Sequence, residues 1–110
     1  MTQRDICHEC HDVCLDTLVN HCLEEGGNHV EQQHVKLLMD CIQLCQTSAD
    51  FMHRNSAHAA AVAQACAEVC DACADSCDDF DSREMKRCAE ICRKCADHCR
   101  EVGGESRRAA

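Results

Sequence analysis

The chain contains no proline and only four glycines among its 110 residues. The glycines occur as two pairs, Gly26-Gly27 and Gly103-Gly104. Proline and glycine are the usual breakers of regular structure, so their scarcity indicates long helices rather than a loop-rich sandwich. Tryptophan and tyrosine are also absent, and the phenylalanines are limited to Phe51 and Phe80. A core built from this chain therefore lacks bulky anchors.

Positive charge and long apolar runs are scarce as well. The net charge is -9 with histidine neutral, which argues against nucleic-acid binding because that function needs a basic face. No apolar run approaches the length of a membrane span, and the N-terminal residues show no signal-peptide pattern. We therefore expect a cytoplasmic protein with no nucleic-acid or membrane partner, although a processed precursor would look the same. One domain is expected at this length.

The remaining pattern predicts four helices of about 20 residues with short connections. They run from about Asp5 to Glu25, Val30 to His53, Ala57 to Asp78 and Ser82 to Val102. Ser56 and Asp81 are candidate caps, the latter paired with Glu84. Such helices predict an all-α fold, an antiparallel up-down four-helix bundle. We expect residues 1–102 to form this single bundle and residues 103–110 a disordered tail.

Fourteen residues are cysteine. In each predicted helix, most of the cysteines lie on the same face. In the third predicted helix the cysteines are separated by steps of 4, 3 and 4, and the fourth helix repeats that spacing. Steps of 3 and 4 mark the face of a helix that packs in a bundle, so cysteine stands where leucine is usual. The in-phase cysteines are Cys7, Cys10, Cys14, Cys41, Cys45, Cys66, Cys70, Cys73, Cys77, Cys88, Cys92, Cys95 and Cys99.

Antiparallel alignment of these phases stacks the cysteines into layers across the bundle. The expected layers are Cys7 with Ser48, Cys66 and Cys99; Cys10 with Cys45, Cys70 and Cys95; Cys14 with Cys41, Cys73 and Cys92; and Leu38 with Cys77, Cys88 and either Thr17 or His21. Cys22 follows Cys14 by eight residues, so at about 100° per residue it points roughly 80° away. His21 holds the in-phase position instead. Cys22 either flanks the core or is an ordinary half-buried cysteine, and we include it among the candidate metal ligands.

Thiolates at i and i+4 can converge on one soft ion, such as Cu(I), Zn(II) or the iron of a cluster. Structural zinc sites close a tetrahedron of four ligands, commonly from two knuckles on separate loops. Iron–sulfur clusters usually take their cysteines from loops. Cu(I) accepts two or three sulfurs and lets one sulfur bridge two ions. A continuous ladder of thiols therefore favours binding of many Cu(I) ions.

Other functions for these cysteines stay open at this stage. A secreted chain of this composition would be read as a disulfide scaffold, although i,i+4 pairs fit disulfide geometry poorly. A zinc or mixed-metal thiolate buffer is an alternative. A thiol/disulfide redox protein is another, and it predicts a few cysteines of depressed pKa. Adjacent Cys–His pairs diverge on a helix, so no catalytic constellation is evident and we expect no enzyme.

Histidine and methionine distinguish the two ends of the predicted bundle. His21, His34 and Met85 are in phase at one end, which looks polar and open. Met52 lies at the other end, which looks apolar and closed. We expect Cu(I) to reach the core at the first end through His21, His34 and Met85, and Met52 to offer a thioether at the second. The alternatives are gap-filling methionines and solvated histidines.

Taken together, the cysteine motifs resemble those of the cytosolic copper storage proteins of bacteria, four-helix bundles with cysteine-filled cores. The matching features are the two quartets at 66–77 and 88–99, Cys41-x3-Cys45, Cys7-x2-Cys10-x3-Cys14 and the segment 21–25. The resemblance implies multiple Cu(I) ions on the core cysteines, a homotetramer, and storage or detoxification of copper, with a copper chaperone as a further partner. Gln3, Thr17, Leu38 and Ser48 depart from a full set of cysteines and lower the expected capacity.

Overall fold

A computed structural model describes residues 3–109 of the chain and the side chains of residues 5–104, and every element in that part is helical. In chain order the elements are α1 (Gln3–Thr17), η1 (Leu18–Cys22), α2 (Leu23–Glu25), η2 (Gly27–Val30), α3 (Gln32–His53), α4 (Ala59–Asp78) and α5 (Arg83–Ala109). The first three form one continuous rod, because Thr17, Cys22 and Leu23 keep right-handed helical angles at the junctions. The all-α prediction is confirmed.

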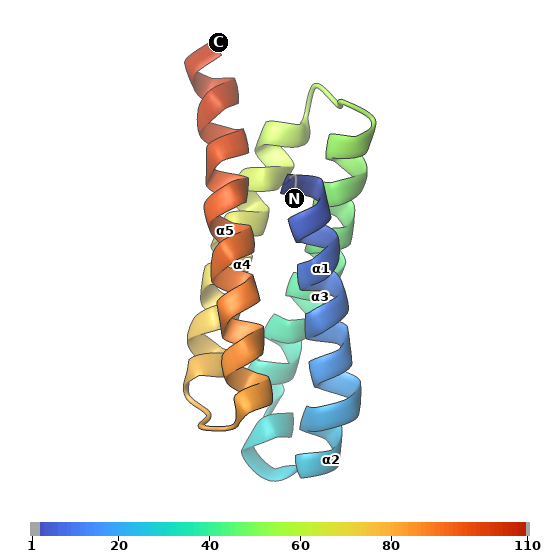
Figure 1. Ribbon diagram of the computed structural model, residues 1–110, viewed down its shortest axis with the longest axis vertical. Helices are drawn as coiled ribbons and strands as arrows, with labels where there is room; N and C mark the ends of the chain where they lie inside the picture. Colours follow the sequence, from blue (N-terminus) through green and yellow to red (C-terminus); the bar gives the residue numbers. More distant parts are fainter. Residues whose placement is uncertain (1–2, 110) are drawn as a thin grey trace.

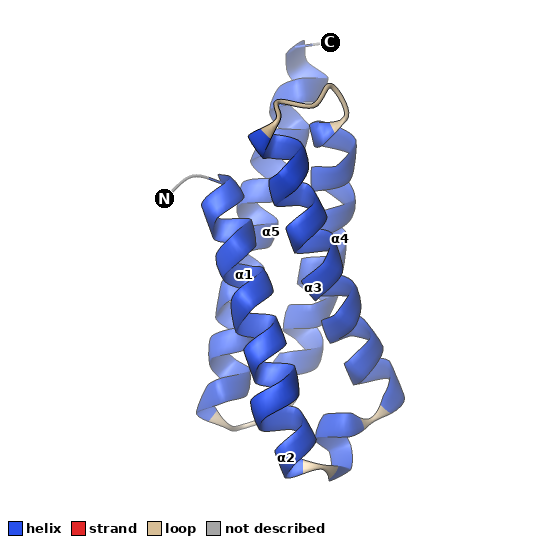
Figure 2. Ribbon diagram, turned by 90° about the vertical axis from the view of Figure 1, so that its right-hand side faces the viewer, coloured by secondary structure: helices blue, strands red, loops and turns tan. Residues whose placement is uncertain are grey.

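Four helical rods pack side by side in an elongated bundle of 46 × 24 × 20 Å. The α1 rod lies against α3 and α5, and α4 lies against the same two helices from the other side (Figure 1). Successive rods run in opposite directions and are joined by short turns (Figure 2). The structure is therefore the expected antiparallel up-down four-helix bundle. Within the described residues, no helix is both long and apolar enough to cross a membrane.

The turn after the first rod depends on glycine. Gly26 and Gly27 have φ of 68° and 54°, angles that glycine adopts without the steric cost of a Cβ. The predicted stop at this pair is confirmed. The 3₁₀ turn η2 follows, so α3 begins slightly later than the sequence predicts. The Glu31 side chain caps it by accepting the N–H of Gln33 at 3.2 Å.

Serines hold the other two turns. The Ser56 hydroxyl accepts the N–H of His58 at 3.0 Å, just before α4. At the start of α5, the Ser82 hydroxyl accepts the N–H of Met85 at 3.4 Å. The expected Asp81 cap is therefore wrong by one residue, because the helix starts at Arg83 and its flanking residue is Ser82.

The end of α5 differs from the sequence-based boundary. The helix continues through Gly103 and Gly104 to Ala109, where the sequence predicts an end at residue 102. Its last turns extend beyond the neighbouring helices (Figure 1). Gly103 lies close to α4, since a Cβ added there would stand 2.7 Å from Cγ of Gln64. Ala110, also part of the expected tail, lies outside the described residues.

Candidate metal centre

All fourteen cysteines are free, and each is fully buried in the bundle. Their contacting Sγ atoms lie 3.5–4.0 Å apart. Ten of them form five successive pairs along the bundle axis: Cys7/Cys99, Cys66/Cys95, Cys45/Cys70, Cys10/Cys41 and Cys14/Cys92. We call these pairs the rungs of the thiol ladder. Each rung combines with the next into a quartet whose four Sγ atoms all lie within 4.8 Å of one another.

In three of the four expected layers, cysteines that the helical phases place together have Sγ atoms within 4.8 Å of one another. Within one layer, the Sγ of Cys45 lies 3.6 Å from that of Cys70 and 3.8 Å from that of Cys95. Contacts also join neighbouring layers, for example Cys41 to Cys70 at 3.7 Å. Cys14 extends the ladder to Cys88 at 3.5 Å. The thiols therefore form a continuous column rather than separate sites.

Hydrogen bonding distributes the protons of this column unevenly. Contacts with Cys10 and then Cys41 raise the pKa of Cys45. Thiol donors converge on two other positions, where Cys10 and its neighbours lower the pKa of Cys41 and of Cys95. Burial opposes every thiolate, because removing the charged form from bulk water is costly. Each arriving cation can displace a proton from a thiol of this column.

Cys22 lies inside the core, where its sequence phase does not place it. The segment η1 is a π-helix, in which the N–H of Leu23 bonds to the carbonyl of Leu18, five residues earlier. A π turn accommodates one extra residue, so Cys14 and Cys22 are related as if seven residues apart, about 20° from two full α-helical turns. The expectation that His21 holds the in-phase position is therefore wrong.

A site with mixed ligand types lies at the end of the bundle that contains η1. The Sγ of Cys22 is 3.6 Å from Nε2 of His34 and 3.7 Å from Sδ of Met85. The other ring nitrogen of His34 contacts the Ser76 hydroxyl at 2.8 Å, which fixes the imidazole orientation. Burial lowers the pKa of His34 and raises the pKa of Cys22 to about 11, the latter with added repulsion from Cys88. A neutral imidazole, a thiol and a thioether thus converge, and all three are soft or borderline ligands.

The other two predicted ligands lie apart from this cluster. His21 is partly buried at the rim, with Nε2 3.1 Å from the Ser82 hydroxyl and its ring 5.1 Å from that of His29. Met52 is half-buried at the opposite end of the bundle and packs against the core. Sequence reasoning thus grouped His21 with the polar end and included Cys22 among the candidate ligands, but it did not predict that Cys22 lies inside the core there.

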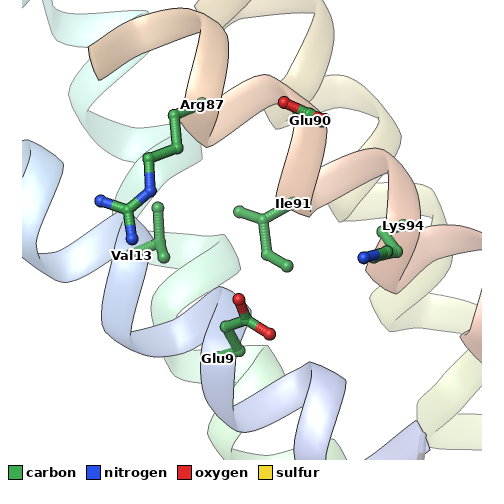
Figure 3. A pocket seen from close by; sticks show the side chains of 6 residues that line it. All are labelled: Glu9, Val13, Arg87, Glu90, Ile91 and Lys94. Carbon is green, nitrogen blue, oxygen red and sulfur yellow. The ribbon is translucent and has the colours of Figure 1, made fainter. Parts of the chain in front are cut away.

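Two surface pockets differ in their relation to the thiols. A pocket of about 300 Å³ is lined by His34 together with Asn28, Glu31, Ser76, Asp79 and Phe80. It reaches the imidazole that contacts Cys22. A smaller groove between α1 and α5 has a charged rim and a floor formed by Val13 and Ile91 (Figure 3). Those two side chains are buried, and no cysteine is among the residues that line this groove.

Comparison with known proteins identifies this arrangement. The family described as Csp, copper storage protein, matches residues 1–104. The chain belongs to the copper storage protein family. The fold is similar to the crystal structure of the Nmul_A1745 protein from Nitrosospira multiformis, at 45% identity, 94% coverage of both chains and a TM-score of 0.91. Among proteins with curated functions, no sequence matches the chain.

Two structures of relatives are described explicitly as copper storage proteins. The Cu(I)-bound copper storage protein BsCsp3 is 27% identical, with 92% of this chain and 94% of that chain covered and a TM-score of 0.85. The apo form of copper storage protein 3 from Bacillus subtilis has a TM-score of 0.83 at 24% identity, covering 92% and 95% of the two chains, and supports the fold. The resemblance inferred from the cysteine motifs is confirmed.

Proposed function

We propose that this chain stores and buffers Cu(I) in the cytoplasm, holding many ions per chain on thiolates inside the bundle and catalysing no reaction. Residues 1–102 act as one storage unit, serving copper supply or detoxification. The observation that carries the proposal is the continuous thiol ladder, in which every rung but the terminal ones belongs to two quartets. Its ligands are the thirteen in-phase cysteines, with Cys22, His34 and Met85 at one end and Met52 at the other.

The geometry of the ladder suits a small monovalent ion that accepts shared ligands. Sulfurs 3.5–4.0 Å apart are close enough for two or three of them to contact one Cu(I). A thiolate within a rung can bridge ions on both of its sides. Each ion displaces a proton from a thiol, so the loaded core stays near neutral and avoids the cost of buried net charge. Capacity then approaches one ion per cysteine.

An anaerobic titration of the fully reduced protein with Cu(I) tests this function. A competing Cu(I) chelator reports how many ions the protein withholds. We expect about ten or more Cu(I) per chain, because each sulfur serves two ions and each ion takes two sulfurs. Saturation at one to three ions would show that the ladder is mainly packing.

The polar end is the route by which we propose that copper reaches the ladder. Its His34 lines an open pocket and touches the buried Cys22. His21 lies at the rim beside Ser82 and is expected to share this role from farther out. His34→Ala should therefore slow copper loading by about tenfold, the effect of losing one ligand worth about 1.4 kcal/mol in the transfer step. His21→Ala is the matched variant and should slow loading less.

The loading rate is measured by stopped-flow transfer from a Cu(I) chelator, with capacity determined separately on the same samples. Equal rates for the wild-type chain and the His34→Ala variant would contradict this route. In the cell, the donor that we propose is a copper chaperone.

We propose that the chain assembles into a homo-oligomer. Its family resemblance indicates a tetramer. Leu15, Val19, Leu23 and Met39 are exposed large apolar residues on the α1 rod and α3, the pair of helices facing the viewer in Figure 2. Exposed apolar side chains that gather into one patch are typical of subunit interfaces, and we propose that these four form such a patch. Sedimentation of the wild-type chain should give a tetramer, and Val19→Glu should shift it toward smaller species. A wild-type monomer would refute the assembly.

A further inference from the structure

The π-helical segment η1 separates two alternative alignments of the end of the first rod. In the structure, the extra residue brings Cys22 inward and leaves His21 at the rim. If Leu18–Cys22 were an ordinary α-helix, His21 would lie about 20° from the direction of Cys14 and Cys22 about 80° from it. Cys22 would then align with Leu15, whose exposed fraction is 40%. The two alignments exchange a buried thiol for a buried imidazole.

The segment that follows η1 does not oppose this exchange by packing. Only Leu23–Glu25 follow the π segment before the turn, and all three of those residues are exposed. A change of alignment moves them by about 1.5 Å along the axis and about 100° around it. Gly26 and Gly27 can absorb that movement, because no heavy atom of their surroundings lies within 4 Å of a Cβ built on either.

Each alignment has its own stabilising contacts. The π alignment places Cys22 against Met85 at 3.7 Å and keeps the His21–Ser82 contact at 3.1 Å. The α alignment would restore regular i→i−4 hydrogen bonds, which a π turn gives up. The switch thus exchanges the Cys22 contacts with His34 and Met85 and the His21 contact with Glu84 for regular helical hydrogen bonds and a buried imidazole.

We propose that η1 is a register switch: the end of the first rod alternates between an α alignment that presents the Cys22 thiol to solvent and the π alignment that buries it beside His34 and Met85. The outward thiol binds the Cu(I) of a donor as a thiolate, while its proton passes to the donor ligand that is released. The return to the π alignment carries the ion to the end of the ladder. The copper-carrying step rests on the proposed function, whereas the switch itself is a property of the copper-free chain.

Alkylation of the folded, copper-free protein tests the switch independently of copper. The reduced protein is treated with iodoacetamide under nitrogen, and each cysteine is followed by peptide mass spectrometry. A minor state populated at about 0.1–10% makes Cys22 react at that fraction of its rate in the unfolded chain. Ladder thiols such as Cys88 react only on wider opening, at fractions of about 10⁻³–10⁻⁶. Equal protection of Cys22 and Cys88 would overturn the proposal.

Deleting Asn20 separates a register switch from simple fraying of the bundle end. The deletion puts Cys22 seven residues after Cys14, so an uninterrupted α-helix holds the thiol inside and no alternative alignment remains. We expect Cys22 labelling to slow at least tenfold, toward the rate of Cys88. Asn20→Ala keeps the chain length, loses the same exposed bond to Asp16, and should label like the wild-type chain. Unchanged labelling after the deletion would assign the reactivity to fraying and refute the switch.

A variant that acts in the opposite direction covers the case in which the deletion does not fold. His21→Leu stabilises the α alignment, because it places an apolar side chain at the core position. It also weakens the π alignment, because it removes the His21–Ser82 contact. Faster labelling of Cys22, with Cys88 unchanged, is the expected result. A slower or equal rate would contradict the proposal. Copper capacity measured on the same variants reports on the storage function separately.

Discussion

Among single residues, Ser48 interrupts the thiol face of α3. It follows Cys45 by three residues, is fully buried, and its hydroxyl has no hydrogen-bond partner among the described residues. A buried hydroxyl without a partner costs about 1–3 kcal/mol. A cysteine at this position would remove that cost and add a sulfur to the layer of Cys7, Cys66 and Cys99.

Ser48→Cys should therefore raise both the stability and the copper capacity. We expect the free energy of unfolding of the copper-free protein to rise by about 1 kcal/mol, measured by urea denaturation under reducing conditions. Capacity should rise by about one Cu(I) per chain. Thr47→Cys is the matched control, since it adds a cysteine one residue earlier, where the threonine hydroxyl bonds to the carbonyl of Gln43. An equal gain in both variants would show that a cysteine outside the ladder suffices.

The residue types of the site could be predicted from the sequence, but one position could not. Period and topology placed the thirteen in-phase cysteines in their layers, because straight α-helices repeat every 3.6 residues. Cys22 and His21 were interchanged because η1 is not α-helical. No local residue pattern marks Leu18–Cys22 as a π turn. The eight-residue step from Cys14 to Cys22 was the available signal, and the contacts of Cys22 with His34 and Met85 favour the π turn that buries it.

At the scale of the helices, the boundaries set by special backbone angles were predictable, and those set by neighbouring helices were not. Gly26 and Gly27 stop the first rod as their sequence indicates. The paired Gly103 and Gly104 look the same in sequence, yet both lie inside α5. There, glycine serves close packing, because Gly103 approaches the Gln64 side chain on α4. A residue pair alone cannot distinguish a turn from a close contact.

This difference predicts opposite effects of one substitution at adjacent positions of α5. Gly104→Ala meets no atom within 4 Å and should raise the free energy of unfolding by about 0.5–1 kcal/mol through helix propensity. Gly103→Ala gains the same propensity but places a Cβ 2.7 Å from Cγ of Gln64. Displacing that side chain should cost about 1–3 kcal/mol. Denaturation of both variants measures the difference, and equal stabilisation would refute the close approach.

For the whole molecule, the order of the rungs decides which metals can fill the core. A Zn–S bond of about 2.3 Å gives a tetrahedron with edges of about 3.8 Å, so each quartet also fits one zinc ion. Neighbouring quartets share a rung, however, and ions in both would lie about 2.7 Å apart by the same tetrahedral geometry. The Coulomb repulsion between two dications is four times that between two monovalent ions at the same distance. Zinc must therefore skip every second quartet, whereas Cu(I) need not.

Five rungs contain at most two quartets that share no cysteine, so we expect the ladder to take about two Zn(II) per chain in four-thiolate sites. The count is measured by elemental analysis after gel filtration, with Co(II) as a spectroscopic substitute that reports tetrahedral thiolate coordination. Added Cu(I) should displace the zinc, because Cu(I) uses all the rungs. Four or more tightly bound Zn(II) would contradict the repulsion argument and favour a zinc or mixed-metal buffer.

Removing one rung at a time makes this expectation specific to the ladder order. Without the terminal rung, Cys7/Cys99, the four remaining rungs still supply two independent quartets, so the double alanine variant should keep the wild-type zinc count. Without Cys66/Cys95, the rungs Cys45/Cys70, Cys10/Cys41 and Cys14/Cys92 remain connected but supply only one quartet at a time. Zinc bound in four-thiolate sites should then fall by about half. Both variants lose two thiols, so any difference between them reports the position of the rung and not the number of cysteines. Equal zinc counts in the two variants would show that the metals do not follow the ladder.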